Sequence, residues 1–482
     1  MPPRPDRLAG MTAPAAIQAG QPCRKRPAVR TLVTIDMICG VTTQTPVVRG
    51  LPVLGSALQM ARDPAQFFVD SYREHGPVFR VRILNQKYAV IAGIEAANYL
   101  GTQEGRENLR SKEFWQGLVD EYGATRVIMG EDGAAHKELR EIMRRGYSRE
   151  AIVGRLDEVI EITDRNLEET WRPGGTVPVV RAMQYLVTDQ LGQLLTGESR
   201  PEYVADIRTA TLYILNVLVT RQRPKILLAD PRYKRAKARI AELGHKILGQ
   251  HREQSDRPAI LVDDIMRAHR DDPAAMPADD LILGVTAPYV AGLDTVANTL
   301  AAFVYAVLKH PQVHARVRAE ADELFSRDEI TEKDLRGIPA IRGALMETMR
   351  LYPIAVAQIR TATRDFTFEG HPIAAGESVY LGTTVPHFLD EYFPDAKSFD
   401  IDRYEKPRAE HLQAGAYSPY GRGQHVCLGK SLADIQMLVT TARMFHKLDM
   451  SLESPDYTLV RKTAPGPGPA MTFRIRVDGY RN

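Results

Sequence analysis

The segment Tyr417–Ser418–Pro419–Tyr420–Gly421–Arg422–Gly423–Gln424–His425–Val426–Cys427–Leu428–Gly429–Lys430 carries the most specific pattern in this chain. A helical pattern follows over 428–447, so Cys427 is expected at a helix N-terminus, where free amides and the helix dipole favour a thiolate. Three glycines remove side chains where the backbone must approach a flat, bulky partner: Gly421, Gly423 and Gly429. A lone thiolate flanked by glycines fits a ligand to haem iron. The alternative is a buried cysteine that packs as a small hydrophobe, which is the commoner case for a cysteine in general.

Five residues of this segment occur at the spacing of the haem-binding loop of the cytochrome P450 family: Tyr420, Gly423, His425, Cys427 and Gly429. The sequence therefore resembles that family over about 50–482. The resemblance implies haem b with Cys427 as the axial thiolate ligand of the iron. Tyr420 stands where the family usually has Phe, a replacement of similar shape.

A second match lies 80 residues before the cysteine, where Glu347 and Arg350 are three residues apart on one helical face and close enough to pair. Such pairs are common on solvated helices, but here the resemblance identifies an ExxR motif. It implies that Arg403, in the loop 399–404, is the third member of a buried structural cluster on the haem side of the core.

The longest predicted helix runs over 279–309 and is apolar on nearly every face, which is typical of a buried helix. Pro288 predicts a kink near 291–295. That segment resembles the family's oxygen-activating segment, with Gly292 admitting dioxygen, Thr295 holding a hydrogen bond to it and Asp294 passing protons inward as a general acid. The alternative is a Thr bonded back to its own helix and an Asp paired with a neighbouring base.

Haem propionates need cationic partners. By resemblance these are His136 and Arg140, on a helix predicted over 132–147, together with Arg360 and His425. Each base alone is as well explained as an ordinary surface residue. Further bases predict a patch for an acidic electron donor such as a ferredoxin, although a solvated charged face is nearly as good an explanation; they are Lys137, Arg144, Arg145, Arg422 and Lys430.

Composition excludes several other classes. The 482 residues are 44% hydrophobic and 26% charged, so a large core is available and global disorder is excluded. The net charge of 63 − 60 = +3 argues against a nucleic-acid partner. Three cysteines without a CxxC pair argue against zinc knuckles, iron–sulfur cages and disulfide scaffolds. No run of about 18 apolar residues occurs, so we expect no transmembrane anchor and a cytoplasmic protein.

We expect a mainly α fold with small β-sheets, and by resemblance the cytochrome P450 fold with the haem between the long central helix and the helix after the cysteine loop. Residues 1–48 are predicted to be a flexible extension and 49–482 a single domain. Helices are expected over 149–171, 181–195, 231–254 and 312–324. Strands are expected over 78–83, 88–91, 366–368, 378–381 and 471–477.

The predicted activity is insertion of one oxygen atom of O2 into an apolar small organic substrate. Electrons would come from NAD(P)H through separate redox proteins. The resemblance implies a largely apolar pocket whose walls include Pro288, Ala291, Ile354, Val356 and Gln358. Three alternatives remain: a peroxide-using enzyme, a rearranging haem-thiolate enzyme, and a non-catalytic haem sensor or carrier.

Overall fold

A computed structural model describes residues 44–253 and 259–481 of the chain. Helices form most of it: α1 Ala57–Arg62, α2 Pro64–His75, α3 Gly93–Tyr99, α4 Gln103–Asn108, α5 Lys112–Tyr122, α6 Gly133–Arg144, α7 Arg149–Val153, α8 Leu156–Thr170, α9 Val179–Leu191, α10 Val204–Tyr213, α11 Pro231–Glu253, α12 Leu261–Asp271, α13 Ala278–Lys309, α14 Pro311–Leu324, α15 Glu332–Arg336, α16 Pro339–Leu351 and α17 Lys430–Lys447. The mainly α class with small sheets is confirmed.

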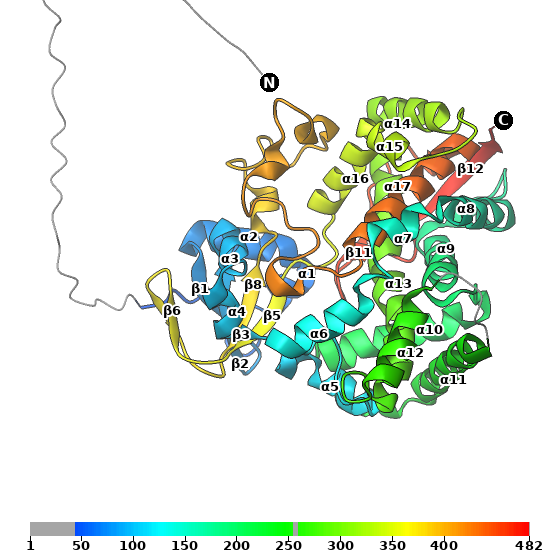
Figure 1. Ribbon diagram of the computed structural model, residues 1–482. Coiled ribbons are helices and arrows are strands. Elements are labelled where there is room, and N and C mark those ends of the chain that lie inside the picture. Colours follow the sequence, from blue (N-terminus) through cyan, green and yellow to red (C-terminus); the bar gives the residue numbers. More distant parts are fainter. Residues whose placement is uncertain (1–43, 254–258, 482) are drawn as a thin grey trace, which may run out of the picture. The chain divides into compact units, whose positions relative to one another are not determined.

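Strands form small sheets, and the largest of them lies at one side of the helices (Figure 1). The largest has the order β1-β2-β8-β5-β3, built from β1 Val78–Ile83, β2 Gln86–Ala92, β3 Leu109–Arg110, β5 Gln358–Ala362 and β8 Ser378–Gly382. A second has the order β4-β12-β9, built from β4 Thr176–Pro178, β9 Leu448–Leu452 and β12 Arg474–Tyr480. Two hairpins complete the set, β6 Phe366–Phe368 with β7 His371–Ile373, and β10 Arg461–Lys462 with β11 Gly468–Pro469.

Helix α13 lies at the centre of the helical part (Figure 1). It packs on α9, and Phe303 of α13 meets Phe445 of α17 edge to face at 5.8 Å between ring centroids. Pro288 sits within a helix that continues through 291–295. In length and composition α13 could cross a membrane, but 83% of its most apolar window is buried, so its apolar surface is used in core packing.

Several element boundaries depart from the sequence expectation. The helix expected over 149–171 breaks into α7 and α8 at Gly154 and Arg155. Strand β12 begins at Arg474, three residues later than expected. The helix after the cysteine begins at Lys430, so Cys427 lies in the preceding turn.

The predicted extension over 1–48 lies outside the described residues up to position 43. Residues 44–48 already belong to the fold, because Val47 forms a bridge with Arg80 and the amide of Val48 donates to the Arg80 carbonyl at 2.9 Å. The described residues, 44–253 and 259–481, belong to one compact unit.

Candidate active site

The cysteine loop is a tight structure that presents an accessible thiol. The amide of Cys427 donates to the carbonyl of Tyr420 at 3.0 Å, closing the loop on itself. Cys427 is exposed, although the surrounding protein raises the pKa of its thiol by burial, partly offset by a hydrogen bond from the Gly429 amide and by the charge of Arg140. The position of Cys427 before a helix N-terminus is therefore not enough by itself to make its thiol a thiolate. A coordinating metal ion deprotonates a thiol outright, so an exposed, partly enclosed Cys427 fits iron ligation.

Two glycines of the predicted site lie where a Cβ would meet a close neighbour, a backbone carbonyl at Gly423 and a leucine side chain at Gly292. Gly423 has φ +72°, and a Cβ there would lie 2.3 Å from the carbonyl oxygen of Leu100. Gly292 is buried, and a Cβ there would lie 2.3 Å from Cδ1 of Leu191 on α9. The side of Gly292 where a Cβ would stand faces a neighbouring helix, and the predicted opening toward dioxygen stays a prediction. The third predicted glycine, Gly429, has room for a Cβ, since its nearest contact would be the Tyr147 ring at 3.7 Å.

Tyr420, the residue that replaces the family's usual Phe, has a bound hydroxyl. It donates to the carboxylate of Asp434 on α17, and the Lys430 ammonium lies 5.7 Å from its ring centroid. Burial, followed by the charge of Asp434, raises the pKa of Tyr420 well above its ordinary value. The ring therefore keeps a neutral hydroxyl that ties the cysteine loop to the helix that follows it.

The four predicted propionate partners come from three separate elements. Rings of His136 and His425 lie 4.5 Å apart between centroids. Arg140 donates to the Val426 carbonyl at 2.8 Å, which joins α6 to the cysteine loop. Arg360 on β5 is buried and donates to the side chain of Gln358 at 2.8 Å.

These bases have few carboxylates near them. Among the described residues neither Arg140 nor Arg360 has a carboxylate within ion-pair distance, and only His425 does, with Asp132 at 2.8 Å. Burial lowers the pKa of Arg360 to about 10. Burial, followed by the charges of His425 and Arg140, lowers the pKa of His136 to about 4. A buried guanidinium without a counter-ion fits the carboxylates of a haem.

One face of the buried central helix is accessible. Ala291 and Thr295, one turn apart, are exposed, whereas the residues between them are buried. The hydroxyl of Thr295 donates to the carbonyl of Ala291 at 2.7 Å, so its oxygen keeps lone pairs that can accept a hydrogen bond. Asp294 beside it is buried and pairs with Lys462. These two contacts are the non-catalytic alternative, in which the Thr bonds back to its own helix and the Asp pairs with a base. The exposed hydroxyl of Thr295 also fits a catalytic role.

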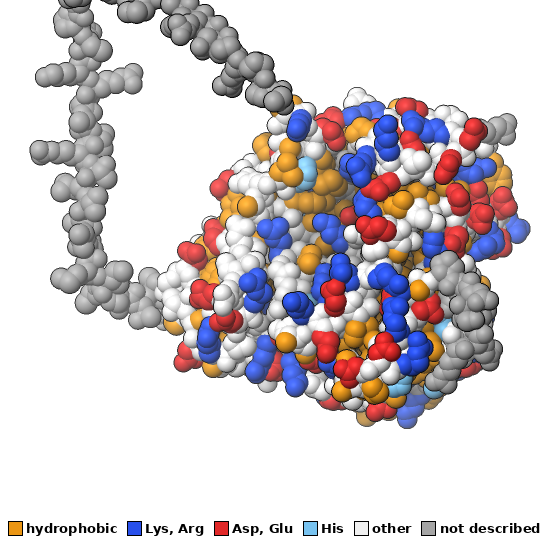
Figure 2. Space-filling model, viewed as in Figure 1, with side chains coloured by type: hydrophobic (Ala, Val, Ile, Leu, Met, Phe, Trp, Pro, Cys, Tyr) orange, Lys and Arg blue, Asp and Glu red, His pale blue; other side chains and the backbone are white. Residues whose placement is uncertain are grey.

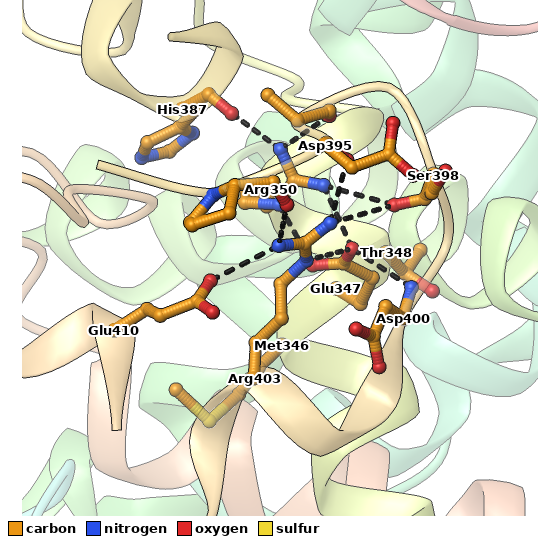
Figure 3. Close-up of polar contacts among 12 residues, drawn as sticks. Met346, Glu347, Thr348, Arg350, His387, Asp395, Ser398, Asp400, Arg403 and Glu410 are labelled. Carbon is orange, nitrogen blue, oxygen red and sulfur yellow. Dashed lines mark hydrogen bonds and ion pairs between the residues drawn. The ribbon is translucent and has the colours of Figure 1, made fainter. Parts of the chain in front are cut away.

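The predicted structural cluster is brought together completely (Figure 3). Arg350 binds both carboxylate oxygens of Glu347 at 2.7 Å, and Arg403 donates to one of them at 3.1 Å. All three side chains are essentially inaccessible. Arg350 also donates to carbonyls of the loop before Arg403, and Glu410 accepts from Arg403 at 3.0 Å. The cluster pins α16 to the segment that leads to the cysteine loop.

The predicted pocket residues differ in accessibility. Ala291 is exposed, and Ile354 and Gln358 are half-buried. Pro288 and Val356 are buried, and Val356 packs in the cluster beneath the large sheet. Of the five, Ala291 is therefore the only one that is exposed.

Sequence reasoning missed partners that only the fold brings close. Asp132 accepts from His425, from the Ser111 amide at 2.8 Å and from Gln424 at 3.1 Å. An Asp directly before a predicted helix is typical of a capping residue. The sequence therefore indicated where Asp132 lies, but not that it binds His425. Lys462 and Asn298 surround Asp294, and nothing in the sequence pattern pairs residue 462 with residue 294.

Known proteins match this arrangement over most of the chain. The family model named Cytochrome P450 matches residues 45–463. Cyclooctat-9-en-7-ol 5-monooxygenase of Streptomyces melanosporofaciens is 26% identical over 80% of this chain and 84% of its own. Taxane 10-beta-hydroxylase of Taxus cuspidata is 23% identical over 81% of this chain and 80% of its own. A solved cyanobacterial P450 with bound retinoic acid superposes with a TM-score of 0.78 at 23% identity, covering 90% of this chain and 98% of the other.

Proposed function

The chain belongs to the cytochrome P450 family, and from that premise we propose how its own residues bind the haem, handle protons and meet a redox partner. The family predicted from the cysteine loop is thus confirmed, and the protein is a cytochrome P450 monooxygenase, an oxidoreductase with thiolate-ligated haem. Bound haem supplies the iron at which dioxygen is activated, so that one oxygen atom enters the substrate and the other leaves as water.

Cys427 is the residue that would hold the iron, and the base cluster would hold the propionates. The observations that carry this proposal are the accessible thiol of Cys427 and the buried Arg360, which has no carboxylate within ion-pair distance among the described residues. Arg140 supports it by linking α6 to the loop through Val426. His136 would donate a hydrogen bond to the same carboxylates, and His425, whose Nε2 is bound to Asp132, would do so in its doubly protonated form.

Thr295 and Asp294 would handle the protons. The Thr295 hydroxyl is exposed on the accessible face of α13 and can accept a hydrogen bond there while it donates to Ala291. Asp294 lies next to it in the chain and would bring protons from solvent. A proton path of this kind is needed when dioxygen is reduced and is not needed by a haem carrier.

The substrate would be a largely apolar organic molecule against the face of Ala291. Two relatives are named as a monooxygenase of cyclooctat-9-en-7-ol and as a taxane hydroxylase. The compounds in these names are built on carbocyclic skeletons. We propose hydroxylation of a substrate of this class, with Gln358 as the polar side chain that would orient it.

Electrons would come from NAD(P)H through a ferredoxin or a similar protein in the cytoplasm. Of the five predicted basic residues, Arg144 pairs with Glu141 and Arg145 with Asp264. Figure 2 shows Lys and Arg side chains mixed with Asp and Glu over the region of α6 and α7. The remaining three have no carboxylate within ion-pair distance among the described residues and would form the docking surface: Lys137, Arg422 and Lys430.

Turnover with isotopically heavy dioxygen tests this proposal. Purified protein is given NADPH, a ferredoxin, its reductase and cyclooctat-9-en-7-ol as the probe substrate. We expect a product that carries one heavy oxygen atom and requires the reductant. A product of unchanged mass, or one formed with hydrogen peroxide but not with NADPH, would instead support a rearranging or a peroxide-using enzyme.

A further inference from the structure

A buried ion pair links the helix of the proposed proton path to a distant hairpin. The Lys462 ammonium lies 2.7 Å from Oδ1 of Asp294, and both side chains are largely removed from solvent, with exposed fractions of 19% and 8%. Charges removed from water in this way need a compensating partner, since an unpaired charge of this kind is strongly unfavourable. Each of the two therefore constrains where the other lies.

The contacts on the Asp294 carboxylate are one-sided. Lys462 and the amide of Asn298, at 3.0 Å, both bind Oδ1. Oδ2 accepts no hydrogen bond from any residue in the described ranges. The carboxylate is thus fixed by one oxygen while the other is left to exchange a proton.

The hairpin that carries Lys462 reaches two parts of the molecule. Alternate side chains of a strand point to opposite sides. On one side, the hydroxyl of Thr463 donates to the Ala61 carbonyl at 2.6 Å, and Arg461 lies 3.7 Å from Asp63, at the junction of α1 and α2. On the other side, Lys462 reaches α13.

The second strand of the hairpin closes on the same place. A Cβ at Gly468 in β11 would lie 3.0 Å from Cγ of Asn298, so the backbone of the hairpin rests directly on the residue that shares Oδ1 with Lys462. The hairpin, Asn298 and Asp294 therefore form one packed unit at this turn of α13.

We propose that Lys462 is a positioning residue for proton delivery: it holds Oδ1 of Asp294 so that Oδ2 is presented beside Thr295, and it makes this geometry depend on the placement of the β10–β11 hairpin. The inference rests on the proposed function, which gives Asp294 its role. It adds a residue that lies 168 positions further along the chain.

A double-mutant cycle tests whether the pair is energetically coupled, independently of any activity. The variants are Lys462→Met, Asp294→Asn and the combination, with Arg461→Met as a control on the same strand. We expect the double variant to lower the melting temperature no more than the worse single variant, because either change already breaks the pair. Additive shifts would overturn the proposal, since they would mean that the two side chains do not act together.

The infrared stretching band of carbon monoxide bound to the reduced protein tests positioning as distinct from stability. We expect one narrow band in the wild type, a broadened or split band in Lys462→Met, and recovery of the narrow band in Lys462→Arg, whereas Arg461→Met leaves it unchanged. A Lys462→Met band identical to that of the wild type, with a shifted band in Asp294→Asn, would refute the role of Lys462 alone. A band that ignores Asp294→Asn would instead refute the proposed role of Asp294.

Discussion

Replacing Glu347 by Gln is the sharpest test of the buried cluster that supports the cysteine loop. The Glu347 carboxylate accepts from Arg350 twice at 2.7 Å, from Arg403 at 3.1 Å, from the Asp400 amide at 3.0 Å and from the Tyr404 hydroxyl at 2.7 Å. Gln keeps the shape of the Glu347 side chain, but its amide NH2 replaces one carboxylate oxygen. A hydrogen-bond donor then faces the donors of the neighbouring residues. The charges of Arg350 and Arg403 are balanced by those of Glu347 and Glu410, so Glu347→Gln leaves one uncompensated buried positive charge.

We expect Glu347→Gln to lower the free energy of unfolding by about 3–5 kcal/mol, the usual result of removing one partner of a buried pair. Asp402→Asn is the matched control, since Asp402 lies in the same loop and binds Arg316 at 2.7 Å with both side chains about half exposed. Its loss should remain within about 1 kcal/mol.

Urea unfolding followed by circular dichroism measures both variants, with haem content recorded on the same samples. The reasoning is refuted if Glu347→Gln is no less stable than Asp402→Asn at an unchanged dependence on urea. A large loss in both variants would also refute it, because burial would then not be the property that distinguishes the two pairs.

Three further outcomes are expected. Burial, with the charge of Arg350, lowers the pKa of His387 to about 3, so the unfolded chain takes up a proton there below about pH 6.5 and the folded chain does not. Between pH 7 and pH 5 the free energy of unfolding of the wild type should therefore fall by about 2 kcal/mol through this residue. His387→Gln should flatten that part of a plot of the urea midpoint against pH. Gly423→Ala should lower the melting temperature and the haem content because of its positive φ and the Leu100 carbonyl, whereas Gly429→Ala should leave the melting temperature nearly unchanged. Thr295→Ala should raise the fraction of NADPH electrons recovered as hydrogen peroxide, and Thr299→Ala, one turn further along α13, should not.

Local patterns in the sequence predicted much of this molecule. Residues three apart on a helix lie on one face, so the pairing of Glu347 with Arg350 could be read directly. The largely apolar composition of α13 on nearly every face predicted a buried central helix, and the family resemblance placed Arg403 with Glu347 and Arg350.

Contacts between distant segments could not be predicted in this way. Which helix faces Gly292 depends on packing, and a Cβ there would meet Leu191 of α9. Lys462 meets Asp294 only because a hairpin returns to α13, and no periodicity encodes that return. The break between α7 and α8 at Gly154 lay within an amphipathic pattern that favoured a continuous helix.

The central claim is that Cys427 ligates haem iron as a thiolate, and a carbon monoxide difference spectrum of the reduced protein tests it most directly. The wild type should show the strongly red-shifted Soret band of thiolate-ligated haem, and Cys427→Ser should lose that band. A protein that takes up no haem, or a Soret band that is the same in wild type and Cys427→Ser, would contradict the account.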